Sequence, residues 1–320
     1  EAGDLIVRVD DTDTPGLKQR EIIDLLRGRV DTRVDLLVRR PAVKGHLRLS
    51  ARRMHIVPET VAYHREGDAA YLRVSGFNQE TAASLERTVE RAKRDIGGGL
   101  EGYILDLRGN PGGLLDQAVD VSDLFVSEGR IVSTHGRHPD SHQYFSARRD
   151  DLGDGRPVVV LVDRGSASAA EIVAAAIQDS GRGIVVGSGS YGKGTVQTVL
   201  RLPNQGELTL TWARFHAPSG YALSKRGVLP DVCTSRIDGS AETITTALRS
   251  GQLPVDRNLR RRSVAPDDSK GLADLRAECP PRHHGDGGTD VEVARRLLHD
   301  RELFRLAVGK PSPSLAKAQP

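Results

Sequence analysis

Ser168 and Lys193 are the residues of this 320-residue chain whose types and surroundings could perform covalent chemistry. A serine hydroxyl is a poor nucleophile until a base takes its proton. Lysine can be that base when burial lowers its pKa from about 10.4 to ~7–8, because desolvation disfavours the ammonium form. Lys193 lies between two glycines in a loop that could bury it. The two residues therefore predict a serine nucleophile with a lysine as its general base.

Backbone amides near Ser168 offer the second requirement of such chemistry, which is stabilisation of a developing anion. Ser168 begins an alanine-rich segment, residues 168–179, that predicts a helix. The free N–H groups at a helix start favour an anion, so the amide of Ala169 is a natural oxyanion donor. A second donor is available in the turn at residues 111–113, where glycine amides are not shielded by side chains.

Alternating segments from about residue 69 onward predict how these residues are positioned. Strand-like runs followed by helix-like runs are typical of an α/β fold with a mostly parallel sheet and flanking helices. The strands are expected at residues 102–107, 157–162 and 183–186, the helices at 114–125 and 168–179, and two further strands at 196–202 and 207–215. Loops that follow parallel strands meet at one edge of the sheet, so we expect Gly112, Ser168 and Lys193 to converge there.

The ends of the chain differ from this central part, and we expect three regions: residues 1–40, 41–238 and 239–320. In the first region the pattern predicts strands at 4–10 and 34–38 and a helix at 19–27, which is too little for a whole domain. In the last region, an extension with a linker and short helices is expected. Residues 250–290 are rich in Pro, Gly, Asp and Arg and predict a linker or a loosely packed extension. Residues 290–307 have a helical, amphipathic pattern.

Composition argues against several classes of function. The formal net charge is only +3 with basic and acidic residues interspersed, so nucleic acid is not an expected partner. No apolar run approaches the roughly 18 residues that span a bilayer. The first residues lack the pattern of a secretion signal and do not start with Met, so we expect a truncated chain. Cys233 and Cys279 have no CxxC spacing, and they are either inert or joined in one disulfide.

Competing interpretations of the same residues carry different weight. A serine at a helix start is most often only an N-cap, which applies to Ser166 and Ser168 alike. Gly187-x-x-x-x-Gly192-Lys193 nearly spells a nucleotide-binding P-loop, but Gly194 stands where Ser or Thr must bind magnesium. The GxSxG pattern and the HExxH pattern are both absent. His283 and His284 are interpreted as solvated loop, so neither a metal nor another cofactor is expected.

Five short motifs, taken together, resemble the carboxyl-terminal processing (tail-specific) peptidase family. They occur in the order and spacing of that family, and the resemblance covers about residues 1–235 of the chain. The motifs are Asp106-Leu-Arg-Gly-Asn-Pro-Gly-Gly113, Gly165-Ser-Ala-Ser-Ala-Ala-Glu171, Gln178-Asp179, Tyr191-Gly-Lys-Gly-Thr-Val-Gln197 and Gly227-Val-Leu-Pro-Asp231.

The resemblance implies a role for individual residues. Ser168 matches the nucleophile and Lys193 matches the base. Gln197 matches a glutamine that orients the lysine. Gly113 and Ala169 match the oxyanion donors, and Asp179 matches an acidic, accessory position. Ala170 stands where many members have a third serine, which should matter little because that position is not the nucleophile.

The resemblance also implies a fold, partners and a location. It implies a ClpP/crotonase-like protease core, preceded by the second half of a PDZ domain. The helical carboxyl-terminal extension beyond residue 240 is expected from its own sequence pattern and lies outside the resemblance. The expected activity is endopeptidase action on proteins with unstructured carboxyl-terminal tails, with no cofactor. A homo-oligomer or an adaptor protein is a further partner class. Members are exported, so the implied location is extracytoplasmic, in the bacterial periplasm. The alternatives are a P-loop-like nucleotide hydrolase and a catalytically silent scaffold.

Overall fold

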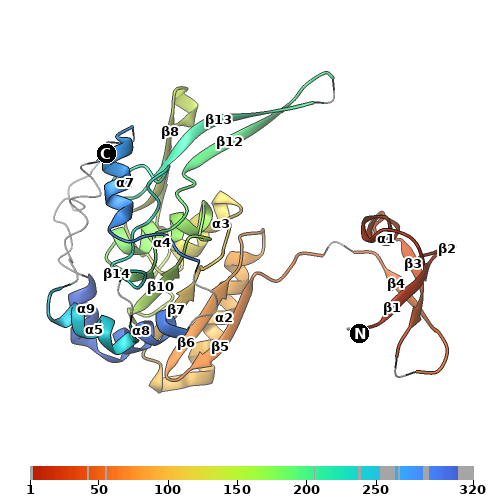
Figure 1. Ribbon diagram of the computed structural model, residues 1–320, viewed down its shortest axis with the longest axis horizontal. Helices are drawn as coiled ribbons and strands as arrows, with labels where there is room; N and C mark the ends of the chain where they lie inside the picture. Colours follow the sequence, from red (N-terminus) through yellow and green to blue (C-terminus); the bar gives the residue numbers. More distant parts are fainter. Residues whose placement is uncertain are drawn as a thin grey trace. The chain divides into compact units, whose positions relative to one another are not determined.

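The computed structural model describes residues 3–41, 43–54, 56–204, 206–236, 239–252, 264–265, 267–283 and 288–308. The chain forms two compact units, Glu1–Pro58 and Glu59–Pro320. Most of their helices and strands are labelled in Figure 1. The first unit contains one sheet and the second contains two.

The first unit is an antiparallel sheet with one short helix. Its elements are β1 (Leu5–Val9), β2 (Thr12–Asp13), α1 (Gln19–Leu26), β3 (Arg33–Arg39) and β4 (Leu47–Arg52), in the strand order β2-β1-β3-β4. Val9, Val34 and Val38 form its small buried core. The unit extends beyond residue 40 because β4 pairs with β3 over six residues. The strands and helix expected in the first 40 residues are all present.

The second unit is built on a six-stranded mixed sheet in the order β14-β11-β10-β7-β6-β5. The sheet consists of β5 (Val61–Glu66), β6 (Ala69–Val74), β7 (Gly102–Asp106), β10 (Val158–Val162), β11 (Gly183–Gly187) and β14 (Val232–Cys233). Only β5 runs antiparallel to its neighbour, and the other pairs are parallel. The α/β fold with a largely parallel sheet is therefore confirmed.

Helices cover both faces of this sheet, because the buried strands carry apolar side chains in both directions. On one face lie α2 (Thr81–Ile96), α3 (Leu115–Asp123) and α4 (Ala169–Asp179), and on the other α5 (Ala241–Arg249), α8 (Gly288–His299) and α9 (Arg301–Val308). Alternate residues of one strand serve the two faces: Val160 belongs to the first cluster, and Val159 and Leu161 belong to the second.

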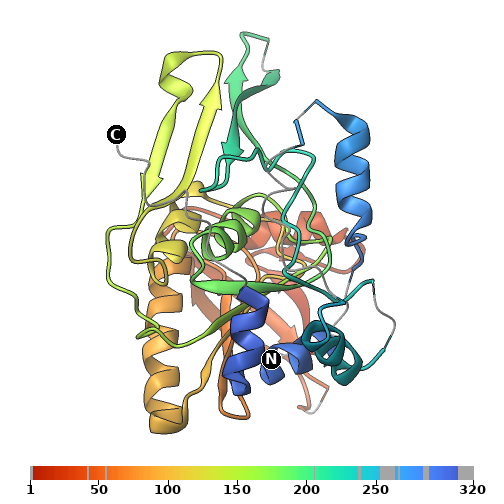
Figure 2. The ribbon, with the colours of Figure 1, turned by 90° about the vertical axis from the view of Figure 1, so that its left-hand side faces the viewer.

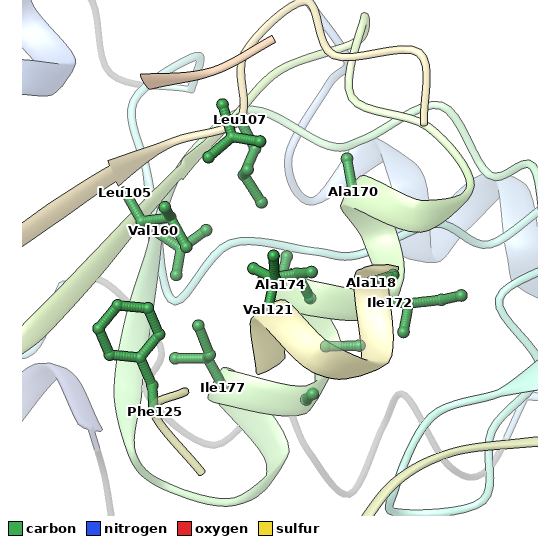
Figure 3. Close-up of a cluster of buried hydrophobic side chains, with 14 of the residues drawn as sticks. Leu105, Leu107, Ala118, Val121, Phe125, Val160, Ala170, Ile172, Ala174 and Ile177 are labelled. Carbon is green, nitrogen blue, oxygen red and sulfur yellow. The ribbon is translucent and has the colours of Figure 1, made fainter. Parts of the chain in front are cut away.

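The alanines of α4 allow that helix to pack closely on its neighbours. Figure 3 shows Ala170, Ala174 and Ile177 of α4 near Ala118 and Val121 of α3, with Leu105 and Val160 of the sheet in the same cluster. Every residue from Ala169 to Gln178 is buried. A helix that is apolar on all sides belongs in a core, and this one fixes Ser168 at its amino end.

A second, four-stranded sheet has the order β12-β13-β8-β9. It consists of β8 (Arg130–Gly136), β9 (Gln143–Ser146), β12 (Thr195–Arg201) and β13 (Glu207–His216), all antiparallel. The β8–β9 and β12–β13 hairpins project from the same side of the unit (Figure 2). Two short 3-10 turns, Gly97–Gly99 and Pro139–Ser141, follow α2 and β8 respectively.

The carboxyl-terminal region contains short helices. Residues 250–290 contain α7 (Ser269–Ala277), whose Leu272 and Leu275 are buried. The helical pattern of residues 290–307 is divided between α8 and α9. Asp300 separates them, because its carboxylate accepts the amides of Glu302 and Leu303 and so caps α9. No helix in the described part of the chain is long and apolar enough to cross a membrane.

A disulfide joins the core to this extension. Cys233 in β14 is bonded to Cys279 just beyond α7, and both residues are buried. The sequence left this pairing open, because spacing alone does not say whether two cysteines meet. The bond attaches α7 to the edge strand of the main sheet.

Removing this disulfide should lower the free energy of unfolding of the second unit. The bond closes a loop between residues 46 positions apart, and a loop of that length is worth about 3–4 kcal/mol of denatured-chain entropy. We expect the Cys233→Ala/Cys279→Ala variant to show that loss in urea unfolding followed by circular dichroism. An unchanged unfolding midpoint would contradict the expectation.

Candidate active site

Ser168 lies at the junction between β10 and α4, at the carboxyl edge of the parallel sheet. It precedes the first helical residue and has φ 56° and ψ −114°. A non-glycine residue with positive φ is costly, and such backbone is held only where surrounding contacts impose it. The side chain is half-buried and so can be reached from solvent. This position combines an accessible hydroxyl with the amino end of a helix.

Ser166 is fully buried, in contrast to Ser168. Its hydroxyl donates to the carbonyl of Leu107 at 2.8 Å and accepts from the amide of Asp163 at 3.0 Å. These bonds join the loop after β10 to the loop after β7. Ser166 therefore has a structural role, and Ser168 is the serine available for chemistry.

We expect the Ser166→Ala variant to lose stability while keeping most of its catalytic capacity. Removing the hydroxyl leaves the buried amide of Asp163 without its acceptor, while the Leu107 carbonyl keeps only the amide of Asn110. An unsatisfied buried donor costs about 1–3 kcal/mol. The measurements are urea unfolding and cleavage of a disordered protein below the unfolding transition. Complete inactivity of a folded Ser166→Ala protein would contradict this assignment.

The glycine turn after β7 lies directly against Ser168. A Cβ atom on Gly112 would come within 2.8 Å of the Ser168 Cβ and 3.0 Å of the Ala169 amide nitrogen, so only glycine fits there. Within the described chain, the amides of Gly113 and Ala169 donate no hydrogen bond to a protein acceptor. Two unused N–H groups near one hydroxyl can bind an oxyanion.

Two polar side chains hold these turns in place. The Asn110 amide donates to the carbonyl of Val74, and its oxygen accepts the amide of Gly112, both at 2.8 Å. The Asp163 carboxylate accepts the amides of Gly109 and Gly165, also at 2.8 Å. Because Asn110 and Asp163 are buried, their bonds are protected from competition with water.

The Lys193 loop is joined to Ser168 through the buried carboxylate of Glu171. One oxygen, Oε2, accepts the amide of Ser168 at 2.8 Å and the amide of Lys193 at 2.9 Å. The other, Oε1, accepts the amide of Gly192 at 2.6 Å and the hydroxyl of Ser190 at 2.5 Å. A single side chain therefore fixes the backbone of the serine next to the backbone of the lysine.

Glu171 combines two opposing electrostatic influences. Burial raises the pKa of this carboxyl, because a charge is costly away from water. The hydrogen bonds from Ser190, Gly192, Ser168 and Lys193 oppose that shift by stabilising the ionised form.

The loop after β7 is anchored by a buried ion pair. The Arg108 guanidinium contacts both carboxylate oxygens of Asp106 at 2.9 and 2.8 Å and reaches Asp290 of α8 at 3.3 Å. Burial alone would raise the pKa of Asp106, but the hydrogen bonds and charge of Arg108 outweigh it and lower the pKa. The pair joins the start of the glycine turn to the opposite helical layer.

Comparison with known proteins places this arrangement in a family. Residues 68–234, which include all of these loops, match peptidase family S41. The chain belongs to peptidase family S41. The match contains every strand of the main sheet except β5, together with the loops at its carboxyl edge.

Individual relatives agree with this membership. The chain is 41% identical to a carboxy-terminal-processing protease of Bartonella bacilliformis, over 72% of this chain and 54% of that protein. It is 34% identical to the carboxy-terminal processing protease CtpA of Bacillus subtilis, over 92% of this chain and 56% of that protein. The chain thus spans about half the length of these relatives. A solved photosystem II D1 C-terminal processing protease is 32% identical, with a TM-score of 0.49 and coverage of 72% and 62%.

Not every predicted site residue lies at the centre of this S41 site. The side chains of Lys193 and Gln197 are both exposed, so the burial expected for the lysine is absent in this structure. In the described chain neither side chain forms a hydrogen bond. Asp179 ends α4, about 16 Å along the helix from Ser168, and its carboxylate accepts the amide of Ser219. The structure therefore separates Asp179 from the serine.

The residues after Lys193 also bear on the P-loop interpretation. A P-loop leads into a helix whose amino end binds phosphate, whereas here β12 begins at Thr195. Glu171 ends the motif Gly165-Ser-Ala-Ser-Ala-Ala-Glu171, but the family resemblance assigns it no role. The signal that could have identified it is the S-x-x-E spacing of Ser168 and Glu171, which is the pattern of a capping box.

Proposed function

We propose that this chain is a serine endopeptidase in which Ser168 is the nucleophile and Lys193 the general base. The observation that carries the proposal is the shared contact with Glu171, whose Oε2 accepts the amides of both residues. Two loops 25 residues apart in sequence are thereby held side by side at the carboxyl edge of the sheet.

The proposed reaction proceeds through an acyl-enzyme. The neutral Lys193 amine takes the Ser168 proton as Oγ attacks the carbonyl carbon of the peptide bond. The amides of Gly113 and Ala169 bind the oxyanion. The lysine ammonium then gives its proton to the leaving amine as the C–N bond breaks. Lys193 then takes a proton from a water molecule as the water oxygen attacks the acyl carbon. It gives this proton to the Ser168 Oγ as the ester bond breaks and the carboxyl product leaves.

Substrate binding has a defined part in this proposal. Because Lys193 is exposed in the free chain, its amine loses water only when a peptide covers the site. Desolvation favours the neutral amine, so binding itself prepares the base. Gln197 follows on β12, four residues beyond the lysine, and we propose that it orients the Lys193 amine.

We further propose the identity of substrates, domains and location. The substrates are proteins with unstructured carboxyl-terminal tails. Action near a carboxyl terminus is supported by the relatives, which are named carboxy-terminal processing proteases. The central part is a ClpP/crotonase-like core, the first unit is part of a PDZ domain, and a homo-oligomer or adaptor protein is a further partner. The periplasm is the proposed location, and the buried disulfide supports it because disulfides persist in oxidising compartments.

Covalent labelling tests the proposed function directly. We expect a fluorophosphonate probe to modify Ser168 and to block cleavage of a disordered protein, with the modified peptide identified by mass spectrometry. Labelling should persist in EDTA and be unaffected by ATP with magnesium, because the mechanism uses protein groups alone. Cleavage that continues after complete labelling of Ser168 would overturn the proposal.

A further inference from the structure

The carboxyl-terminal extension reaches the Lys193 loop through one side chain, Arg276 near the end of α7. Its guanidinium Nη1 donates to the carbonyl of Arg226 at 2.9 Å, and Nη2 donates to the carbonyl of Ser190 at 3.1 Å. The planar guanidinium suits two acceptors with a fixed spacing. Arg276 therefore joins two segments of the core that are 36 residues apart in sequence.

Both of those segments support Lys193. The Ser190 hydroxyl donates to Glu171 at 2.5 Å and accepts the amide of Val228 at 2.7 Å. The carbonyl of Gly192 accepts the amide of Lys225 at 2.8 Å. The contacts of Arg276 thus continue, by way of Ser190, to the carboxylate that holds the lysine backbone.

The extension is fixed on the core next to Arg276. The Cys233–Cys279 disulfide lies three residues beyond the arginine. Further along, the backbone of Arg282 exchanges two hydrogen bonds with the Ser188 hydroxyl, at 2.9 and 3.1 Å, and its carbonyl accepts the amide of Arg164. The extension therefore contacts both the lysine loop and the loop that precedes Ser168.

We propose that Arg276 is a positioning residue for Lys193 and that the Cys233–Cys279 disulfide holds it in place. The carboxyl-terminal extension thus supports the lysine loop through this one side chain. This inference rests on the proposed function, in which Lys193 is the base. Arg276 contacts the backbone of the lysine loop and not the reacting hydroxyl. It therefore affects the chemical step indirectly, through the position of the Lys193 amine.

The test compares Arg276→Ala with Lys270→Ala. Lys270 is an exposed cationic residue in the first turn of the same helix, so its removal is the matched control. A small displacement of a catalytic group costs on the order of 10- to 100-fold in rate. We expect that loss in kcat for Arg276→Ala, with KM within about twofold and no loss in Lys270→Ala. Arg276→Lys should recover part of kcat, because one ammonium can donate to the same carbonyls. Wild-type kcat in a folded Arg276→Ala protein would overturn the proposal.

The role of the disulfide is tested by non-additivity. We expect Cys233→Ala/Cys279→Ala to lower kcat as Arg276→Ala does, and the triple variant to lose no more than either. Losses that multiply, or wild-type kcat without the cysteines, would show that the disulfide does not act through Arg276. Lys193→Ala separates the two proposals: if it stays active, the proposed function fails whatever Arg276 does.

Discussion

Replacing Ser168 with alanine, or Lys193 with alanine or arginine, should abolish peptide-bond hydrolysis by this chain. A nucleophile and its base act as a unit, so each single variant should lose on the order of 10⁴- to 10⁶-fold in kcat and the double variant no more. Lys193→Arg should be as inactive as Lys193→Ala, because a guanidinium stays protonated and cannot accept the serine proton. The measurement is cleavage of a disordered protein by each purified variant.

Matched variants keep this prediction specific. Ser166→Ala, two residues from the nucleophile, and Lys270→Ala on the exposed surface should both retain activity. Gln197→Ala should be affected less than Lys193→Ala, because orienting the base matters less than supplying it. Circular dichroism confirms that each protein is folded. Appreciable turnover by folded Ser168→Ala would exclude Ser168 as the nucleophile.

The main sheet could be predicted from the sequence because its strands are buried on both faces. Such strands are short runs of apolar residues, as in β7 and β10, and each is followed by a helical pattern. The two helices at residues 288–308 were less predictable, since apolar periodicity continues through the break. The break is made where the Asp300 carboxylate accepts the amides of Glu302 and Leu303. An aspartate within a helical pattern does not by itself show that a new helix begins there.

The convergence of the site could be predicted as well, but not its internal contacts. Parallel topology brings the loops after β7 and β10 to one edge whatever their side chains are. The exposure of Lys193 depends on the conformation of one loop. The contact between Arg276 and Ser190 spans 86 residues. No periodicity relates such residues, so tertiary packing alone decides that they meet.

Replacing Glu171 with glutamine should reduce kcat by about 100-fold or more, because the site then loses the acceptor that fixes both catalytic loops. The carboxylate accepts four hydrogen bonds, from Ser168, Ser190, Gly192 and Lys193. A glutamine keeps the shape, but its NH₂ group would face donors where an acceptor is needed. Glu242→Gln is the matched control, since Glu242 is an exposed glutamate in the first turn of α5.

The pH dependence of kcat tests the same residue in the unmodified chain. A protonated Glu171 loses acceptor capacity, as in Glu171→Gln, so activity should fall as the pH decreases through the pKa of this carboxyl. Burial raises that pKa, so the fall begins at a higher pH than for an exposed glutamate. Stability has the opposite dependence. The contribution of a group with a raised folded-state pKa is fully present below its unfolded pKa and is lost as the pH rises through the folded value.

Measuring kcat and urea unfolding from about pH 4 to 8, on either side of the ordinary glutamate pKa, distinguishes the two effects. We expect wild-type kcat to decline on acidification while the contribution of Glu171 to stability increases, and we expect both dependences to be reduced in Glu171→Gln. An acid limb of kcat that is identical in Glu171→Gln and Glu242→Gln would assign that limb to another group. In that case, the contribution of the Glu171 contacts would be measured only by the loss of kcat in Glu171→Gln at a fixed pH.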